Sequence, residues 1–283
     1  MEFLRPTTWA EALAMKAQQP DAVPIAGGTD VMVELNFDRR RPAALLDLTR
    51  IADLTRWDTD GGTVRVGAGV TYRRIIDELA TSLPGLAIAS RTVGSPQIRN
   101  RGTVGGNLGS ASPAGDAHPP LLAADATVEL ASVRGTRAVP VAEFYKGPKR
   151  SVLEPDELVA AFRVAPTGAP QQFAKVGTRN AMVIAVCSLG IALHPAGRRV
   201  GTGIGSAAPT PRRAPRAEEW SAELPWDSRA KLADSTVKKF GELVAAAASP
   251  IDDVRGTAAY RRHALAVLAR RTLTWAWEEY RCA

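Results

Sequence analysis

Apolar residues between positions 10 and 17 recur at the spacing of one helix face, with polar residues between them. Thr8 and Glu11 have the spacing of a capping box, in which each side chain accepts a hydrogen bond from the other residue's backbone N–H. This pattern predicts a helix that begins after Thr8 and ends at Pro20. Short apolar runs further along predict strands over residues 22–26, 44–48, 63–66, 127–131, 137–139 and 158–164, and a helix capped by Thr71 over residues 72–80.

The composition changes in a cluster of proline and glycine at residues 165–170, which we interpret as a linker. After this linker, apolar runs predict three strands of one sheet and helical spacing predicts two helices; the strands cover residues 172–176, 183–193 and 198–205, and the helices residues 230–248 and 257–280. The chain is therefore predicted to have an α/β part up to about residue 165, followed by a smaller α+β part.

The composition is that of an ordinary folded protein, since 45% of the 283 residues are hydrophobic and the formal net charge is +7. The basic clusters are short and have no aromatic residues between them, so nucleic-acid binding is not expected. The longest apolar run, residues 181–193, is too short to span a membrane, and the N-terminus lacks the regions of a signal peptide. We therefore expect a cytoplasmic protein with no membrane span.

Residues that carry acid–base or metal chemistry are few. The two cysteines, Cys187 and Cys282, cannot by themselves hold an iron–sulfur cluster or a structural zinc. His118, His194 and His263 lack the spacing of metal ligands, and we expect each of them on the surface or in a loop. No nucleophile elbow is present. The sequence thus predicts neither catalytic residues nor a metal site in this chain.

Two glycine-rich segments are the most informative feature. One covers residues 24–30 after a predicted strand, and the other covers residues 99–107 and is followed closely by residues 112–116. Glycine lets the backbone approach a ligand, and successive N–H groups can then converge on phosphate oxygens. Neither segment is a Walker A motif or a G-x-G-x-x-G motif. The residues alone predict a buried diphosphate ligand, and tight turns without a ligand are the alternative. Gly67, Gly69 and the glycines of the strand 198–205 are predicted to serve packing.

These segments resemble the FAD-binding (medium) subunit of the molybdenum hydroxylase family, of the xanthine dehydrogenase and carbon monoxide dehydrogenase type. The resemblance covers nearly the whole chain. Its clearest parts are residues 3–6, 26–30, 93–116, 173–179 and 208–214.

The resemblance implies an α+β protein. Residues 1–165 would form the two-subdomain α/β FAD-binding fold of the vanillyl-alcohol-oxidase/MurB type, with subdomains at about 1–56 and 57–165. Residues 171–283 would form a smaller α+β C-terminal domain of three strands and helices. FAD would be bound without a covalent link.

The resemblance also implies the residues of the cofactor site. The first segment and the stretch from Thr103 to Asn107 would surround the pyrophosphate, Asp116 would hold the adenosine part, and Val159 and Lys175 would lie close to the flavin. The complete predicted set is Pro24, Ile25, Ala26, Gly27, Gly28, Thr29, Asp30, Val31, Gly102, Thr103, Gly105, Gly106, Asn107, Ser112, Asp116, Val159 and Lys175.

The implied function is electron transfer within a complex. A molybdopterin-binding large subunit would oxidise the substrate, and an iron–sulfur small subunit with [2Fe-2S] clusters would pass electrons to FAD in this chain and on to NAD, a quinone or O2. The complex is expected to be a dimer of heterotrimers, and Trp275 and Trp277 would lie in the core or at a partner. The alternatives are a self-sufficient FAD-dependent oxidoreductase and a scaffold without cofactor. The substrate stays open among purines, other N-heterocycles, aldehydes and carbon monoxide.

Overall fold

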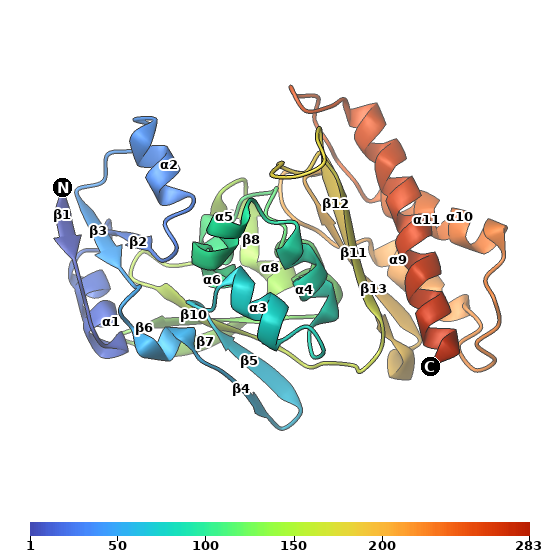
Figure 1. Ribbon diagram of the computed structural model, residues 1–283, viewed down its shortest axis with the longest axis horizontal. Helices are drawn as coiled ribbons and strands as arrows, with labels where there is room; N and C mark the ends of the chain where they lie inside the picture. Colours follow the sequence, from blue (N-terminus) through green and yellow to red (C-terminus); the bar gives the residue numbers. More distant parts are fainter.

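The computed structural model describes residues 1–283 and has three main sheets that follow one another from the N-terminus to the C-terminus (Figure 1). The first sheet is parallel, with the strand order β1 (Glu2–Leu4), β3 (Ala44–Asp47), β2 (Val23–Ile25). Helix α1 (Trp9–Gln18) joins β1 to β2, and the predicted capping box of Thr8 and Glu11 is present. Helix α2 (Val31–Asn36) has no buried residue, and its Glu34 pairs with Lys149 at 2.6 Å.

The second sheet is antiparallel and has five strands, in the order β4 (Trp57–Asp60), β5 (Thr63–Gly67), β10 (Leu158–Val164), β6 (Thr127–Ser132), β7 (Gly135–Pro140). The 3₁₀ helix η1 (Ala52–Thr55) leads into this sheet. Between β5 and β10 the chain also forms α3 (Tyr72–Glu78), α4 (Pro84–Arg91), α5 (Pro96–Arg101), α6 (Val104–Ser110), α7 (His118–Ala123), α8 (Val141–Phe144) and the hairpin of β8 (Tyr145–Gly147) and β9 (Arg150–Ser151).

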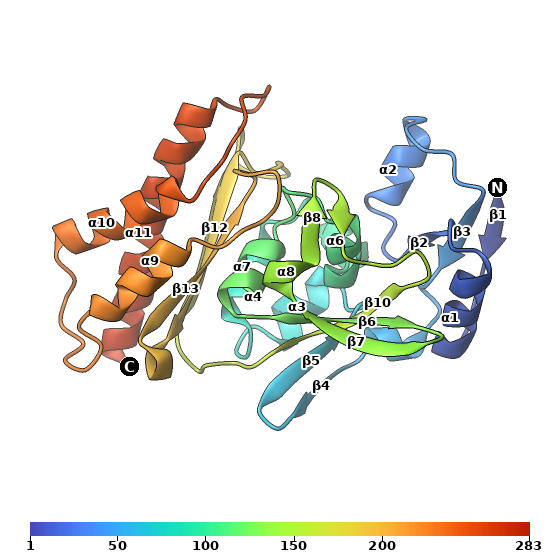
Figure 2. The same ribbon diagram turned by 180° about the vertical axis from the view of Figure 1, so that it is seen from behind.

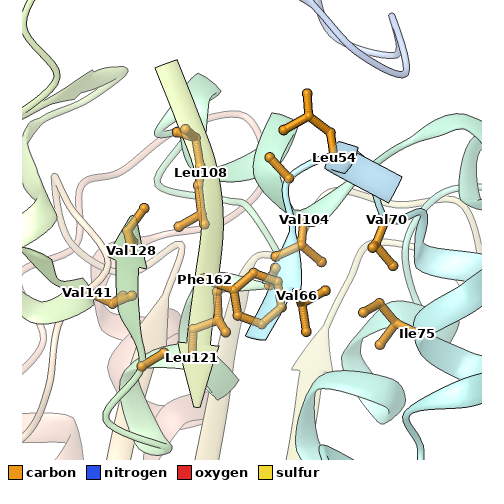
Figure 3. Packing of buried hydrophobic residues seen from close by; sticks show 14 of the residues in the cluster. Leu54, Val66, Val70, Ile75, Val104, Leu108, Leu121, Val128, Val141 and Phe162 are labelled. Atoms are coloured by element: carbon orange, nitrogen blue, oxygen red, sulfur yellow. The ribbon is translucent and has the colours of Figure 1, made fainter. Parts of the chain in front are cut away.

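Apolar side chains from the second sheet and from these helices form one core (Figure 3). Phe162 on β10 and Val66 on β5 lie close to Val104 of α6 in this core, and all three are fully buried. Leu108, one turn further along α6, is also fully buried. Since Val104 and Leu108 fix the apolar side of α6, they also fix which of its glycines face outward.

The third sheet is antiparallel, with the order β11 (Gln171–Val176), β12 (Cys187–His194), β13 (Arg199–Gly205), and 3₁₀ helix η2 (Pro195–Gly197) joins the last two strands. One face is covered by α11 (Ala258–Cys282), with α10 (Asp234–Ala246), α9 (Pro215–Trp220) and 3₁₀ helix η3 (Ser221–Glu223) alongside. Helix α7 packs on the opposite face (Figure 2). No helix, including the 25-residue α11, is long and apolar enough to cross a membrane.

Glycines in the third sheet allow α7 to pack directly on the strands. A Cβ on Gly203 would lie 2.1 Å from the carbonyl oxygen of Pro119, and one on Gly201 would lie 2.1 Å from that of Ala123. His194 Nε2 lies 2.9 Å from the same Ala123 oxygen. These contacts join the C-terminal part to the rest of the chain, and they confirm that the strand glycines serve packing.

The elements with clear hydrophobic periodicity are confirmed with small shifts of their ends. The middle of the chain differs more, because residues predicted as glycine loops form α5, α6 and α7. The predicted strand 183–193 begins only at Cys187. Among the aromatic residues, Trp277 is buried in the C-terminal core, whereas Trp275 is 49% exposed.

The expectation for His118 is wrong. Its side chain is completely buried, and the Tyr145 hydroxyl lies 2.7 Å from Nδ1. Burial lowers the pKa of His118 to about 3, so the imidazole is neutral at physiological pH. This burial depends on tertiary contacts such as the one with Tyr145, 27 positions further along the chain, so the neighbouring residues could not predict it.

Candidate functional site

The first glycine-rich segment, residues 24–31, meets the second, residues 102–107, backbone against backbone. A Cβ built on Gly27 would lie 2.0 Å from the carbonyl oxygen of Arg101 and 2.8 Å from the Cα atom of Gly102. Any side chain at this position would overlap the second segment. The structure therefore brings together two predicted segments that are more than 70 residues apart in the sequence.

The backbone N–H groups of residues 27–30 in the first segment have no acceptor within the chain. None of the N–H groups of residues 27–30 donates a backbone hydrogen bond, while the Gly28 carbonyl accepts one from Met32 at 3.0 Å. Gly28 has a φ of +76°, a left-handed conformation that glycine adopts without strain. Consecutive unpaired N–H groups at such a turn are typical of a site for phosphate oxygens.

The second segment contributes the first turn of α6. Thr103 caps this helix, since its Oγ1 accepts a hydrogen bond from the Gly106 N–H at 2.9 Å. The N–H groups of Val104 and Gly105 have no acceptor in the chain. A Cβ on Gly105 would lie 2.4 Å from the Ala68 carbonyl oxygen, whereas Gly106 is exposed and approaches only Thr103. Gly105 is thus required for packing, and Gly106 is the glycine that a ligand can approach.

Asp116 and Lys175 form a buried ion pair next to these segments. Lys175 Nζ donates to Asp116 Oδ2 at 2.6 Å, to the Thr92 carbonyl oxygen at 2.8 Å and to the Val183 carbonyl oxygen at 3.3 Å. Both side chains are only 9% exposed. An ammonium group has three N–H donors, so Lys175 has none left for a ligand. Asp116 Oδ1, in contrast, is buried without a partner and can accept a hydrogen bond.

This ion pair corrects one detail of the predicted roles. The resemblance implies a place for Asp116 at the adenosine part of FAD and for Lys175 near the flavin, which are the two ends of the cofactor. Side chains 2.6 Å apart cannot serve opposite ends of an extended dinucleotide. Burial raises the pKa of the Asp116 carboxyl, and the Lys175 ammonium and the Thr92 hydroxyl offset part of that rise.

Two further polar atoms near the site are left without partners. They are Asn107 Oδ1 and His118 Nε2, and both lie against Gly115. A Cβ on Gly115 would be 2.7 Å from the first atom and 2.4 Å from the second. Gly115 is therefore required for this close packing.

The remaining predicted residues lie in different surroundings. Pro24 and Ile25 are on β2, Ala26 follows that strand, and Val31 begins α2. Ser112 is half-buried at the start of a turn, and its carbonyl accepts a hydrogen bond from the Gly115 N–H at 3.0 Å. Val159 is a core residue of β10 at a register shift and is 8% exposed. The next residue, Ala160, accepts a hydrogen bond at its carbonyl from the Ala68 N–H, and Ala68 packs against Gly105. Val159 is therefore connected to the site only through these neighbours.

Sequence reasoning missed two residues beside the site. Thr92 supplies both its carbonyl and its hydroxyl to the Asp116–Lys175 pair, the hydroxyl lying 3.4 Å from Asp116 Oδ2. Thr92 directly precedes the stretch 93–116 that carries the resemblance, and this position was the only available signal. Tyr72 was predicted only as the first residue of a helix, yet its ring lies against Gly102.

The arrangement fits FAD. The unpaired N–H groups of residues 27–30 and of the first turn of α6 suit a diphosphate, which offers only acceptors. The unpartnered Asp116 Oδ1 suits a hydroxyl or N–H donor, and FAD carries both in its ribityl chain and flavin ring. The exposed Gly106 leaves room for a ligand to approach the backbone.

Comparison with known proteins agrees with this geometry. Residues 1–167 match the family described as the FAD binding domain in molybdopterin dehydrogenase, and residues 172–276 match the CO dehydrogenase flavoprotein C-terminal domain. The chain belongs to this family, the FAD-binding medium subunits of molybdenum hydroxylases.

Relatives named for different substrates match the chain over much of its length. It is 31% identical to the putative xanthine dehydrogenase FAD-binding subunit of Escherichia coli K12, over 96% of this chain and 94% of that one. It is 35% identical to the nicotinate dehydrogenase FAD-subunit of Eubacterium barkeri, over 68% of each chain. A solved carbon monoxide dehydrogenase from Hydrogenophaga pseudoflava superposes with a TM-score of 0.90 at 28% identity, covering 100% of this chain and 98% of that one.

The buried His118 predicts acid sensitivity of the fold. Below pH 6.5 the unfolded chain binds a proton that the folded imidazole takes up only near pH 3, so stability falls with pH across that window. Between pH 6 and pH 4, we expect the free energy of unfolding of the wild type to fall by about 1.4 kcal/mol per pH unit more than that of His118→Asn. This slope corresponds to the uptake of one proton on unfolding. Urea unfolding at several pH values measures this. His263→Asn, at an exposed position, serves as the control and should keep the wild-type slope.

Proposed function

We propose that this chain transfers electrons within a molybdenum hydroxylase complex, taking them from an iron–sulfur small subunit and delivering them to NAD or another acceptor. A molybdopterin-binding large subunit would oxidise the substrate, and the assembly would be a dimer of heterotrimers. The observation that carries the proposal is the contact of Gly27 with Gly102, which brings two sets of unpaired N–H groups together in a family of FAD-binding subunits.

The two cysteines support the need for a redox partner. Burial raises the pKa of the Cys187 thiol to about 12, so it stays protonated inside the C-terminal core. Cys282 is exposed at the end of α11 and far from Cys187 in the sequence. Neither residue provides an electron relay, and we propose that electrons from a substrate oxidised in another subunit reach FAD through the clusters of the iron–sulfur small subunit.

Each part of the site has a proposed task. The N–H groups of residues 27–30 and of Val104 and Gly105 hold the diphosphate. Asp116 accepts a hydrogen bond from the ribityl–flavin part, and Lys175 positions Asp116 while joining β11 to the FAD-binding part. When bound, FAD supplies the one- and two-electron redox chemistry. Because the Asp116 carboxylate neutralises the Lys175 ammonium, this pair orients FAD more than it changes the reduction potential of the flavin.

The test follows the flavin absorbance under anaerobic conditions. The complex, isolated through a tag on this chain, should contain a molybdenum subunit and an iron–sulfur subunit by mass spectrometry, and its flavin should bleach with the substrate of the large subunit. In the isolated chain, NADH should reduce the flavin and lower its absorbance, whereas the substrate of the large subunit should not. Turnover of an organic substrate by the isolated chain would show a self-sufficient oxidoreductase instead. If NADH left the flavin absorbance unchanged in both the complex and the isolated chain, NAD would be excluded as the acceptor.

A further inference from the structure

Tyr72 lies directly behind the contact between the two glycine-rich segments. It is the first residue of α3, and Thr71 caps this helix by accepting from the Arg74 N–H at 3.4 Å. The Tyr72 N–H donates to the Gly102 carbonyl at 3.0 Å. A Cβ on Gly102 would lie 3.2 Å and 3.3 Å from the ring carbons Cδ2 and Cε2. The backbone and the ring of Tyr72 are therefore both held by the second segment.

The hydroxyl of Tyr72 has no partner, although the residue is only 4% exposed. It forms no hydrogen bond within the chain, and it is not among the fully enclosed polar atoms that lack one. It is thus reachable from outside the protein atoms. Tyr145 provides the contrast, because its hydroxyl lies 2.7 Å from His118 Nδ1. A nearly buried hydroxyl without a partner costs stability unless something binds it.

We propose that the Tyr72 hydroxyl donates a hydrogen bond to the diphosphate of bound FAD, a proposal that rests on the FAD site described above. The residue lies behind Gly102, where the first and second segments meet, and a diphosphate offers only acceptors. Burial and the negative charges of Asp116 and Asp30 raise the pKa of Tyr72 well above its usual value. The phenol therefore keeps its proton at neutral pH and acts as a donor.

The test compares Tyr72→Phe with Tyr145→Phe, each of which removes one hydroxyl and keeps the ring. After removal of the flavin, the Kd for FAD should rise about tenfold in Tyr72→Phe, which corresponds to about 1.4 kcal/mol. In Tyr145→Phe it should stay within about twofold of the wild type. The inhibition constant of ADP against FAD should rise by a similar factor in Tyr72→Phe, because ADP carries the diphosphate without the flavin.

Thermal unfolding of the flavin-free chains separates this role from simple packing. Tyr72→Phe should melt at or above the wild-type temperature, since an unpaired hydroxyl is lost, while Tyr145→Phe should melt lower because His118 loses its partner. Equal FAD affinity in the wild type and Tyr72→Phe, or an unchanged ADP constant, would overturn the proposal and leave the FAD site intact. Absence of FAD binding by the wild type would instead contradict the function proposed above.

Discussion

Replacing Gly27 with alanine is expected to lower the affinity for FAD at least tenfold. The added methyl would lie 2.0 Å from the Arg101 carbonyl oxygen and 2.8 Å from the Gly102 Cα atom, so the two glycine-rich segments must move apart. Overpacking of this kind costs about 1–3 kcal/mol, and each 1.4 kcal/mol is tenfold in affinity. Titration of the flavin-free chain with FAD, followed by the change in flavin fluorescence, measures the effect.

Gly109→Ala is the matched control for this substitution. Gly109 lies on α6 in the same region, and nothing is within 4 Å of the position of its Cβ. Alanine also favours the helix more than glycine does. FAD affinity of Gly109→Ala should therefore equal that of the wild type. If Gly27→Ala bound FAD as tightly as Gly109→Ala, the contact between the segments would have no part in the site.

The second large effect is expected from Gly203→Ala in β13. Its Cβ would lie 2.1 Å from the Pro119 carbonyl oxygen and 2.7 Å from the Pro119 Cα atom, against the rigid first turn of α7. The third sheet can then no longer pack on α7, and we expect the free energy of unfolding to fall by about 3 kcal/mol. Urea unfolding followed by circular dichroism provides the measurement.

A control for Gly203→Ala is available in the turn before β13. Gly197→Ala adds a methyl group where no atom lies within 4 Å, so its stability should stay within about 0.5 kcal/mol of the wild type. If both variants lost the same free energy of unfolding, the packing of Gly203 in β13 against α7 would not hold the two parts of the chain together.

Local patterns explain which elements could be predicted from the sequence. The capping box of Thr8 and Glu11 and the apolar periodicity of the strands depend on neighbouring residues, so they can be read directly. Helices α6 and α7 could not be predicted in this way. Gly105 and Gly106 within α6 disfavour a helix, and so does proline, which occupies position 119 in α7. They form because Thr103 caps α6, its apolar side packs in the core, and proline is tolerated in a first turn.

The candidate site shows the same limit. The glycine-rich segments were visible because the need for glycine leaves a local signal in the chain. The pairing of Asp116 with Lys175 was not, since it depends on how β11 packs against the FAD-binding part across 59 positions of sequence. The resemblance therefore implies roles at opposite ends of FAD for two side chains that the structure places in one ion pair.

The central claim is that the FAD diphosphate lies between residues 27–30 and the first turn of α6. A crystal structure of the chain with FAD tests it most directly. We predict that oxygens of both phosphates accept hydrogen bonds from these N–H groups, and that Asp116 Oδ1 accepts one from the ribityl–flavin part. A diphosphate bound elsewhere, with the N–H groups of residues 27–30 facing water, would contradict the account.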